Sequence, residues 1–462
     1  MNKFWRILPV FLLTGCTVGP DYERPDFYAD AQIADSLNMR EKSDVSLERR
    51  WYEFFNDATL NKLVCLAKRR NLDVKIAVQR LRQARYALDI ARSAYLPALD
   101  AQGAYTRTKA SRNNPVSVRE RYYTTGLDAS WEIDVWGAGR RRTEQAGALY
   151  AANAVAVEDV LIAVRAEVVS VYFSLRAARE QMAVLKKNIG LQKTLYDLSS
   201  ELYQSGLGNL ADLNQAKYAL EKMTAQLPAL EYAARESKNA LTLLTGKLPA
   251  ALDALLNADS DNAAQATVVF DFDTLYALPV GLIRARPDVR RAELELMAQN
   301  AAVGQAVAAM YPNFSVSALI GLQSEPLSKL FSSNSETYQV EPSLGAPLFH
   351  WGALLNRVRA QKAVKEQYVL QYQKTLLSAV TDVKNRINML EAQQKKTASV
   401  RESLESVQTV VSLNLLRYRK GLIPLNELLT QTQLLLETQQ DFIATKLSVC
   451  QGIAAFYKAM GV

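Results

Sequence analysis

The sequence predicts an internally duplicated α+β membrane protein, in which very long helices accompany four strands of a β-barrel shared between chains. Three observations lead to this fold class. No proline occurs between Pro115 and Pro228, and apolar residues recur there at alternating steps of three and four. A second such run follows near the C-terminus, and landmark residues of the two runs recur at one constant offset. Between the helical stretches, four segments of about ten residues alternate apolar and polar side chains.

The N-terminus is expected to be an export signal that ends at a lipidated cysteine. Lys3 and Arg6 precede the apolar stretch Ile7–Leu13, which is too short to span a membrane. It runs into Leu-Thr-Gly-Cys16, which resembles a bacterial lipobox, so we expect a signal peptide over residues 1–15 and a lipidated segment over 16–56. The alternative is an ordinary secretory signal in which the cysteine occurs by chance.

Helical patterning begins near Asp57, is interrupted near Asn71, and ends before Pro97. The period of the pattern then changes to two, which predicts strands at about residues 98–108, 121–135, 313–323 and 337–348. In the second strand, Tyr123 to Val135 places apolar residues on one face and polar residues on the other. In the fourth, two prolines count against a regular ladder, because proline has no N–H to donate.

The alternation of these strands suits a membrane barrel with lipid outside and water inside, or a soluble sandwich that is covered on its apolar face. Two polar connections rich in Ser, Asn and Pro, residues 109–119 and 323–336, favour hairpins of a membrane barrel. Four strands cannot close a membrane barrel, and an unpaired edge in lipid costs several kcal/mol for each unsatisfied group. The barrel must therefore be shared, and physical reasoning alone allows either two or three chains.

The first long helix is predicted from Ala138 to Tyr203 and the second from Ala353 to Tyr418. At about 1.5 Å per residue, each would span on the order of 100 Å. A heptad seam, typical of a helix that packs along a neighbour, runs through the first: Leu161, Val164, Val168, Val171, Leu175, Ala178, Met182, Leu185 and Ile189.

Each long helix should reverse at a glycine turn into a return helix, roughly Leu210–Thr245 and Leu425–Ala459, the first kinked at Pro228. Landmarks of the two halves differ by one offset, for example Trp136 and Trp351 (351 − 136 = 215). The chain is thus expected to consist of a first structural repeat, a connector with a possible strand, and a second repeat: residues 57–245, 246–280 (strand 267–272) and 281–462.

Composition gives no support for catalysis or for nucleic-acid binding. The chain has one histidine, His350, and a net charge of +8 spread over 462 residues without a basic arm. It contains no clustered Ser/His/Asp set, metal-ligand spacing or phosphate loop, so an enzyme and a metal site are not expected. The eight methionines form no cluster that would favour a copper path. The only covalent group expected is lipid on Cys16.

Several motifs, in this order and spacing, resemble the outer-membrane factor family of TolC-type exit ducts. Within it they are similar to the lipoprotein branch that serves resistance–nodulation–division efflux pumps. The motifs are Cys16-Thr-Val-Gly-Pro-Asp-Tyr-Glu-Arg-Pro, Trp51-Tyr-Glu-Phe-Phe-Asn-Asp, Ser130-Trp-Glu-Ile-Asp-Val-Trp-Gly, Arg286-Pro-Asp, Tyr311-Pro and the two Tyr-x-x-Gly turns.

The resemblance implies a homotrimer with a twelve-stranded barrel in the outer membrane and a helical periplasmic tunnel. The duct would be passive, and a periplasmic adaptor (membrane fusion) protein and an inner-membrane pump would dock at its tip. The alternatives are a type I protein-secretion duct and a lipid-anchored periplasmic coiled-coil scaffold. The transported substrate, the adaptor, and the open or closed resting state stay undetermined at this level.

The resemblance also implies which residues act at the tip. Acidic residues are expected at the periplasmic aperture, and Asp212 and Glu427 occupy equivalent places (427 − 212 = 215). Their rival role is to stabilise a helix N-terminus. Arg417, Arg419 and Lys420 lie across the turn and could pair with these carboxylates. The turns expected to contact an adaptor comprise Tyr203, Gly206 and Leu207 in one repeat and Tyr418, Gly421 and Leu422 in the other.

Two further cysteines, Cys65 and Cys450, lie at similar estimated heights along the helices. Two buried free thiols are the favoured interpretation, and a disulfide is the alternative in an oxidising compartment.

Mass spectrometry of the mature N-terminus is expected to find a lipid-modified Cys16, because the lipobox-like sequence directs cleavage just before it. An unmodified cysteine at that position would contradict lipidation. The matched variant Cys16→Ala is expected to lose the lipid mass.

Overall fold

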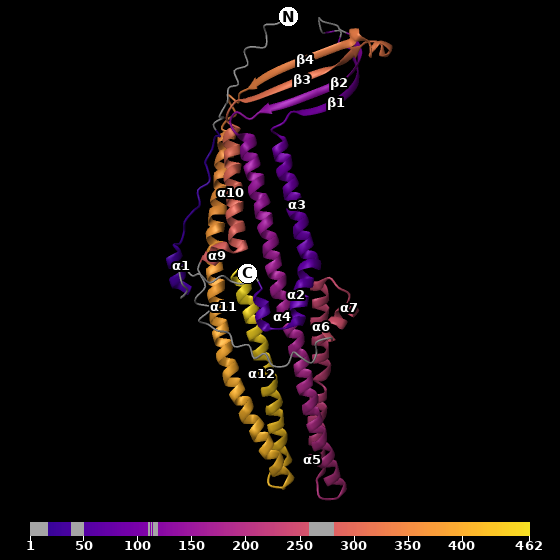
Figure 1. Ribbon diagram of the computed structural model, residues 1–462, viewed down its shortest axis with the longest axis vertical. Coiled ribbons are helices and arrows are strands. Elements are labelled where there is room, and N and C mark those ends of the chain that lie inside the picture. Colours follow the sequence, from indigo (N-terminus) through magenta and orange to yellow (C-terminus); the bar gives the residue numbers. More distant parts are fainter. Residues whose placement is uncertain (1–16, 38–49, 110, 112, 114–118, 258–280) are drawn as a thin grey trace. The chain divides into compact units, whose positions relative to one another are not determined.

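The computed structural model describes residues 17–37, 50–109, 111, 113, 119–257 and 281–462 (Figure 1). The chain divides into two compact units. Unit 1 comprises Met1–Asp26, Arg80–Ala154 and Arg291–Gln373, and unit 2 comprises Phe27–Gln79, Val155–Arg290 and Lys374–Val462. Cys16 and the possible strand at 267–272 lie outside the described residues.

The first repeat and the segment before it contain α1 (Asp30–Leu37), the 3-10 helix η1 (Trp51–Phe55), α2 (Ala58–Arg70), α3 (Leu72–Ser93), β1 (Ala98–Lys109), β2 (Arg119–Ile133), α4 (Ala138–Gln204), α5 (Leu210–Thr224) and α6 (Leu227–Thr245). The remainder contains α7 (Pro249–Asn257), α9 (Gly281–Ala285), α10 (Pro287–Ala308), β3 (Asn313–Ser324), η2 (Leu327–Lys329), η3 (Ser333–Ser335), β4 (Glu336–Gly345), α11 (Ala353–Arg419) and α12 (Leu425–Ala459).

The duplication predicted from sequence is present in the element boundaries. α3 and α10, β1 and β3, and α4 and α11 each begin and end 215 residues apart, as in α4 and α11 (353 − 138 = 215, 419 − 204 = 215). Both long helices therefore contain 67 residues. In α4, the alternating seam faces the inside of the bundle, since its residues are buried or half-buried, with Val168 and Leu185 fully covered.

The first return helix is broken rather than kinked. α5 ends at Thr224 and α6 begins at Leu227, with Pro228 in the first turn of α6. Proline fits there because the first N–H groups of a helix have no partner within the helix. α12, without a proline, runs unbroken from Leu425 to Ala459, as expected.

The strands form one four-stranded antiparallel sheet in the order β1-β2-β3-β4. The expected strand over 121–135 begins and ends two residues earlier, and the expected strand to residue 348 ends at Gly345. β4 ends earlier than expected because Pro347, which has no N–H to donate, lies beyond the last paired residue. Pro342 is accommodated opposite Val316, because β4 is an edge strand that bonds on one side only.

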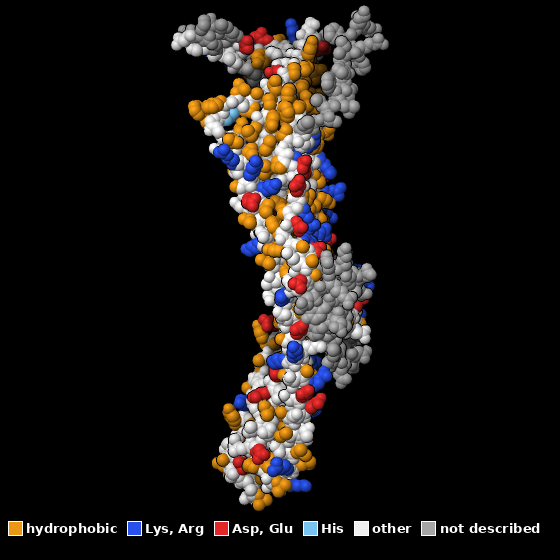
Figure 2. Space-filling model, turned by 90° about the vertical axis from the view of Figure 1, so that its left-hand side faces the viewer, with side chains coloured by type: hydrophobic (Ala, Val, Ile, Leu, Met, Phe, Trp, Pro, Cys, Tyr) orange, Lys and Arg blue, Asp and Glu red, His pale blue; other side chains and the backbone are white. Residues whose placement is uncertain are grey.

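The register places the apolar residues of all four strands on one face. Leu99 faces Ala129, Leu127 faces Ile320, and Ala318 faces Val340 in directly opposed pairs, which share a face of an antiparallel sheet. The opposite face carries pairs such as Asp100 with Asp128. The apolar face is exposed, and Figure 2 shows hydrophobic side chains gathered on the part of unit 1 that carries the strands. The alternation predicted from sequence is confirmed.

Among the described residues, none of the helices combines the length and the continuous apolar composition that a membrane span requires.

The segment after Cys16 is held in a slot of unit 1 by a buried arginine. Arg141 donates hydrogen bonds to the carbonyl oxygens of Val18 and Gly19 and pairs with Asp21 at 2.8 Å. Gly19 adopts a φ of +92°, and a Cβ there would lie 2.6 Å from the Cα of Gly304. Only glycine fits this conformation and this close approach.

In unit 2, η1 packs onto the helices through aromatic rings. Trp51 is buried and stacks on Tyr457 at 4.8 Å, and Phe55 contacts Phe173 at 4.7 Å. Asp57 caps α2 through the N–H of Leu60 and accepts a second hydrogen bond from the Tyr172 hydroxyl at 2.7 Å. Cys65 and Cys450 are both free, as favoured, although Cys65 is exposed rather than buried.

Two equivalent junctions in unit 2 join the end of a return helix to the start of an earlier helix of the chain, α6 to α3 and α12 to α10. Asn71 donates from Nδ2 to the Leu244 carbonyl at 3.0 Å, and its Oδ1 accepts from the N–H groups of Asp73 and Val74. Arg286 holds the equivalent place (286 − 71 = 215) and donates to the Ala459 carbonyl. We call these contacts the neutral junction and the ionic junction.

Each junction also contains a glycine with positive φ. Gly246, at +60°, would bring a Cβ to 2.9 Å from the Arg70 carbonyl oxygen, and Gly461, at +78°, to 3.1 Å from Arg286. These glycines are equivalent too (461 − 246 = 215). In the ionic junction, Arg286 also pairs with both carboxylate oxygens of Asp288, at 3.0 and 2.7 Å, and approaches Asp382.

Replacing Arg286 by alanine is expected to lower the free energy of unfolding by about 1.5–3 kcal/mol, because it removes the charged donor of the Ala459 carbonyl and the bidentate partner of Asp288. The side chain is only 11% exposed. Thermal unfolding followed by the helical circular dichroism signal would measure the loss. Arg290→Ala is the matched control, since that side chain is 48% exposed in a single ion pair with Glu158 and should cost at most about 1 kcal/mol. Equal effects of the two variants would contradict a structural role for the ionic junction.

Candidate functional site

The two hairpin turns of unit 2 have the same backbone structure. Gly206 and Gly421 adopt φ of +74° and +73° at the ends of α4 and α11. The N–H of Leu207 bonds the carbonyl of Leu202 at 2.9 Å, and the N–H of Leu422 bonds the carbonyl of Arg417 at the same distance. With the glycine N–H groups bonded to Tyr203 and Tyr418, these are two Schellman motifs.

Glycine is required at these turns by conformation and not by crowding. Among the described residues, and apart from the glycine and its two chain neighbours, no heavy atom lies within 4 Å of a Cβ built on Gly206 or Gly421. The following leucines stand out from the turns, with Leu207 81% exposed and Leu422 64% exposed. Apolar side chains presented in this way are suited to contact a partner surface.

Asp212 forms a reciprocal cap at the start of α5. Its N–H donates to Asn209 Oδ1 at 2.7 Å, and Asn209 Nδ2 donates to Asp212 Oδ2 at 2.8 Å. This is a variant of the capping box, with Asp212 as the third helical residue. The role at the helix N-terminus is therefore present for Asp212, which is half-buried.

Glu427 differs from its equivalent. It is also the third residue of its helix, but the preceding cap position is Pro424, which makes no side-chain cap hydrogen bond. The Glu427 side chain is exposed. Of the two carboxylates, Glu427 is thus the one without a capping partner in the described residues, although the helix dipole still favours its charge.

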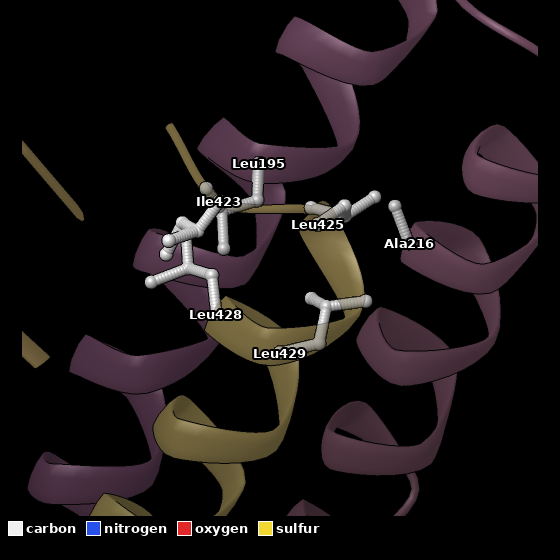
Figure 3. Close-up of a cluster of buried hydrophobic side chains, with 6 residues drawn as sticks. All are labelled: Leu195, Ala216, Ile423, Leu425, Leu428 and Leu429. Carbon is white, nitrogen blue, oxygen red and sulfur yellow. The ribbon is translucent and has the colours of Figure 1, made fainter. Parts of the chain in front are cut away.

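A cluster of apolar side chains packs the two hairpins together near the turns (Figure 3). Leu195 of α4 and Ala216 of α5 meet residues at the start of α12, and Figure 3 shows Leu425 and Leu429 directed toward α5. The cluster consists of Leu195, Ala216, Ile423, Leu425, Leu428 and Leu429. It brings the helices that carry Asp212 and Glu427 side by side.

Tyr418 connects the second turn to the first hairpin. Burial raises the pKa of the Tyr418 hydroxyl, the nearby negative charge of Asp212 raises it further, and a hydrogen bond with Ser199 opposes the shift. Tyr418 packs against the apolar cluster, whereas its equivalent Tyr203 is exposed. Sequence analysis placed both tyrosines at the turns, but it gave no sign that they differ or that Tyr418 faces Asp212.

Buried polar groups between the hairpins were also missed by sequence analysis. Asn188 donates to Gln439 at 2.8 Å, and Gln192 donates to the Ala216 carbonyl at 3.5 Å while its Oε1 has no partner among the described residues. Gln192 is buried on the inner side of α4, four residues beyond Asn188. The only available signal was a polar residue at that helical spacing.

The basic residues across the turn form no ion pair with the acidic ones in this chain, as far as its described residues show. Arg417, Arg419 and Lys420 are all exposed. The described residues likewise contain no group of three or more His, Cys, Asp or Glu side chains placed to hold a metal ion.

The sequence also matches a known family and proteins of known structure. The model of the outer membrane efflux protein family matches residues 63–247 and 278–462, whose starts differ by the offset of the duplication (278 − 63 = 215).

Curated relatives extend the match over nearly the whole chain. TtgC of Pseudomonas putida, described as a probable efflux pump outer membrane protein, is 27% identical over 459 residues, which are 98% of this chain and 93% of TtgC. CusC of Escherichia coli, a cation efflux system protein, is 26% identical over 457 residues, 97% of this chain and 96% of CusC.

Solved structures share the fold. The outer-membrane channel OprN superposes with a TM-score of 0.85 at 27% identity, over 96% of this chain and 99% of OprN. The CmeC outer membrane channel of Campylobacter jejuni superposes with a TM-score of 0.85 at 27% identity, over 96% of this chain and 95% of CmeC. The names of these relatives describe efflux pump or efflux system proteins and outer-membrane channels. The resemblance found in the sequence is confirmed, and the chain belongs to the outer membrane efflux protein family.

Proposed function

We propose that this chain forms, as a homotrimer, the exit duct of a tripartite efflux system that carries small molecules passively across the periplasm and the outer membrane. The observation that carries this proposal is the sheet of unit 1, which has an exposed apolar face and two edge strands, β1 and β4, that have no partner strand among the described residues. In lipid such edges must be paired. Three copies with four strands each would close one barrel of twelve.

A second packing seam on α3 supports assembly with further copies. One side of α3 is buried within the chain through Val74, Ala77, Leu88 and Ala91. The opposite side carries an exposed seam with steps of four and three: Leu72, Ile76, Gln79, Gln83, Tyr86 and Ile90. A helix that is buried on one side and carries apolar and amide side chains at heptad spacing on the other is suited to lie between two neighbours. A second copy of this chain would provide the missing neighbour.

The names of the relatives favour efflux over the two alternatives left by the sequence. TtgC is described as part of an efflux pump and CusC as part of a cation efflux system, which supports an adaptor and an inner-membrane pump as partners here. The exposed Leu207 and Leu422 are the proposed adaptor contacts, together with the tyrosines and glycines of the same turns. Lipid on Cys16 would add an anchor to the one that the barrel provides.

The turns are proposed to form the periplasmic aperture. In a trimer, Asp212 and Glu427 would provide two carboxylates from each chain around the narrow end. Tyr418, beside Asp212, would hold the second hairpin against the first. Like charges confined in a narrow pore attract cations and repel one another.

The mass of the detergent-solubilised protein tests the assembly. Size-exclusion chromatography with light scattering is expected to give three times the mass of the chain, and planar bilayers are expected to show pores. A monomer or dimer that forms no pores would contradict the proposed duct.

The double variant Asp212→Ala with Glu427→Ala is expected to lower cation selectivity and to change conductance in planar bilayers, because it removes the proposed ring of charge. The reversal potential under a salt gradient measures the selectivity. Glu437→Ala, which replaces an exposed carboxylate further along α12, is the control. Selectivity and conductance equal to the unsubstituted protein, in a normally assembled trimer, would leave only the helix-terminus role.

A further inference from the structure

A polar concavity of about 1010 Å³ lies in unit 1 where the strands meet the helices. Its walls come from the end of β2 and the start of α4, from the second half of α10, and from the residues around the start of α11. Its volume is that of a site for a small organic molecule. The proposed aperture and the turns lie in unit 2 and contribute nothing to it.

Two arginines at equivalent positions line this concavity. Arg142 is the fifth residue of α4 and Arg357 the fifth of α11 (357 − 142 = 215). Both side chains are exposed, and within the described part of the chain neither forms an ion pair or a hydrogen bond. The arginines next to Arg142 are engaged, since Arg140 pairs with Asp134 and Arg141 pairs with Asp21 and Glu144. Arg142 and Arg357 thus keep their donors available.

Helix stability does not account for these two arginines. The fifth residue of a helix lies beyond the first turn, where the helix dipole has little effect on a side-chain charge, so the helix end gives no reason for an arginine there. The same placement occurs in both repeats. A ligand of opposite charge would use the guanidinium groups, because the N–H groups of Gly139 and Arg140 at the start of α4 already donate to Asp134.

The carboxylates of the concavity do not cancel the arginines. Asp134 accepts from the N–H groups of Gly139 and Arg140 at 3.0 and 2.9 Å and so caps α4. This leaves Glu132 as the acidic lining residue that is not used in this way. Among the described lining residues, two cations without an ion pair therefore face one carboxylate without one.

The remaining lining offers further donors and an aromatic wall. Gln145 and Gln361 accept hydrogen bonds at their Oε1 atoms from Gln305 and Gln299, each at 2.7 Å, so their amide N–H groups are left to donate. The Trp136 ring stacks on Tyr311 at 4.8 Å. Guanidinium groups with amide donors fit a carboxylate or sulfonate, and the rings fit a flat apolar body.

We infer that this concavity binds the anionic group of small organic solutes, with Arg142 and Arg357 as its charged ligands. Its place on the path of transported solutes rests on the proposed function. The binding itself does not, because every residue of the concavity comes from one chain and one unit.

Isothermal titration of the detergent-solubilised full chain with naphthalene-1,5-disulfonate tests the inference. Arg142→Gln with Arg357→Gln is expected to weaken binding about tenfold, since each substitution removes an exposed charged contact that solvent already screens. Arg142→Lys with Arg357→Lys keeps the two positive charges but loses the planar guanidinium groups. Its affinity for the disulfonate should lie between those of the unsubstituted protein and the glutamine pair. The control, Arg85→Gln with Arg359→Gln, removes two exposed arginines of unit 1 that do not line the concavity and should leave binding unchanged.

Absence of disulfonate binding to the unsubstituted protein, or equal weakening by the control pair, would overturn the inference. If the glutamine pair fails to fold, the affinity of the lysine pair for the disulfonate is the test. An affinity equal to that of the unsubstituted protein would then contradict binding of the anionic group by the two guanidinium groups. Block of single pores by the same disulfonate separates this inference from the proposed function. Pores that the glutamine pair leaves equally sensitive to block would defeat the inference alone, whereas absence of pores would defeat the duct and leave the titration to decide.

Discussion

The structure of unit 2 depends on one repeated contact, in which a side chain after a helix break donates to a carbonyl at the end of a return helix. Asn71 makes this contact with Leu244, and Arg286 makes it with Ala459. The last carbonyls of a helix otherwise have no partner within it. Each contact also fixes the N-terminus of the next helix, through the Asn71 carboxamide oxygen or through Asp288. A glycine of positive φ lets the backbones approach. One side chain thereby joins the end of a return helix to the start of α3 or α10, and the hairpins start from a fixed base.

The two repeats have kept this geometry while their chemistry has diverged. The first junction is neutral and the second is ionic, with Asp288 and Asp382 around Arg286. The turns show the same divergence. Asn209 caps α5 and bonds the Asp212 side chain, whereas the cap position of α12 is Pro424, which makes no side-chain hydrogen bond and leaves Glu427 without such a partner among the described residues. The two repeats of a duplicated chain can have different roles. One copy can supply a rigid helix start while the other presents a free charge.

Much of the fold could be predicted because the periodicity of residues close together in the sequence determines it. The seam of α4, the alternation in the strands and the glycines of the turns depend on neighbours a few residues apart, and the offset between the copies needs only counting. Contacts between distant segments could not be predicted in this way. The approach of Tyr418 to Asp212 and the burial of Gln192 depend on how two hairpins pack, and no local pattern encodes their relative rotation. β4 ended early because Pro347 outweighed an alternation that continued past it. The candidate turns were placed correctly, whereas the partners of their side chains needed the structure.

The equal lengths of α4 and α11 limit how this protein can change in evolution. Both helices have 67 residues, and their turns are packed together by a shared apolar cluster. An insertion of one residue in one helix would rotate everything beyond it by about 100° and advance it by about 1.5 Å, which would take Leu195 away from Leu425 and Leu428. Insertions must therefore come in matched pairs, one in each repeat and each a whole number of turns. Length variation in this lineage should accordingly collect in the connector after α7 and in the strand loops, where no second copy has to match.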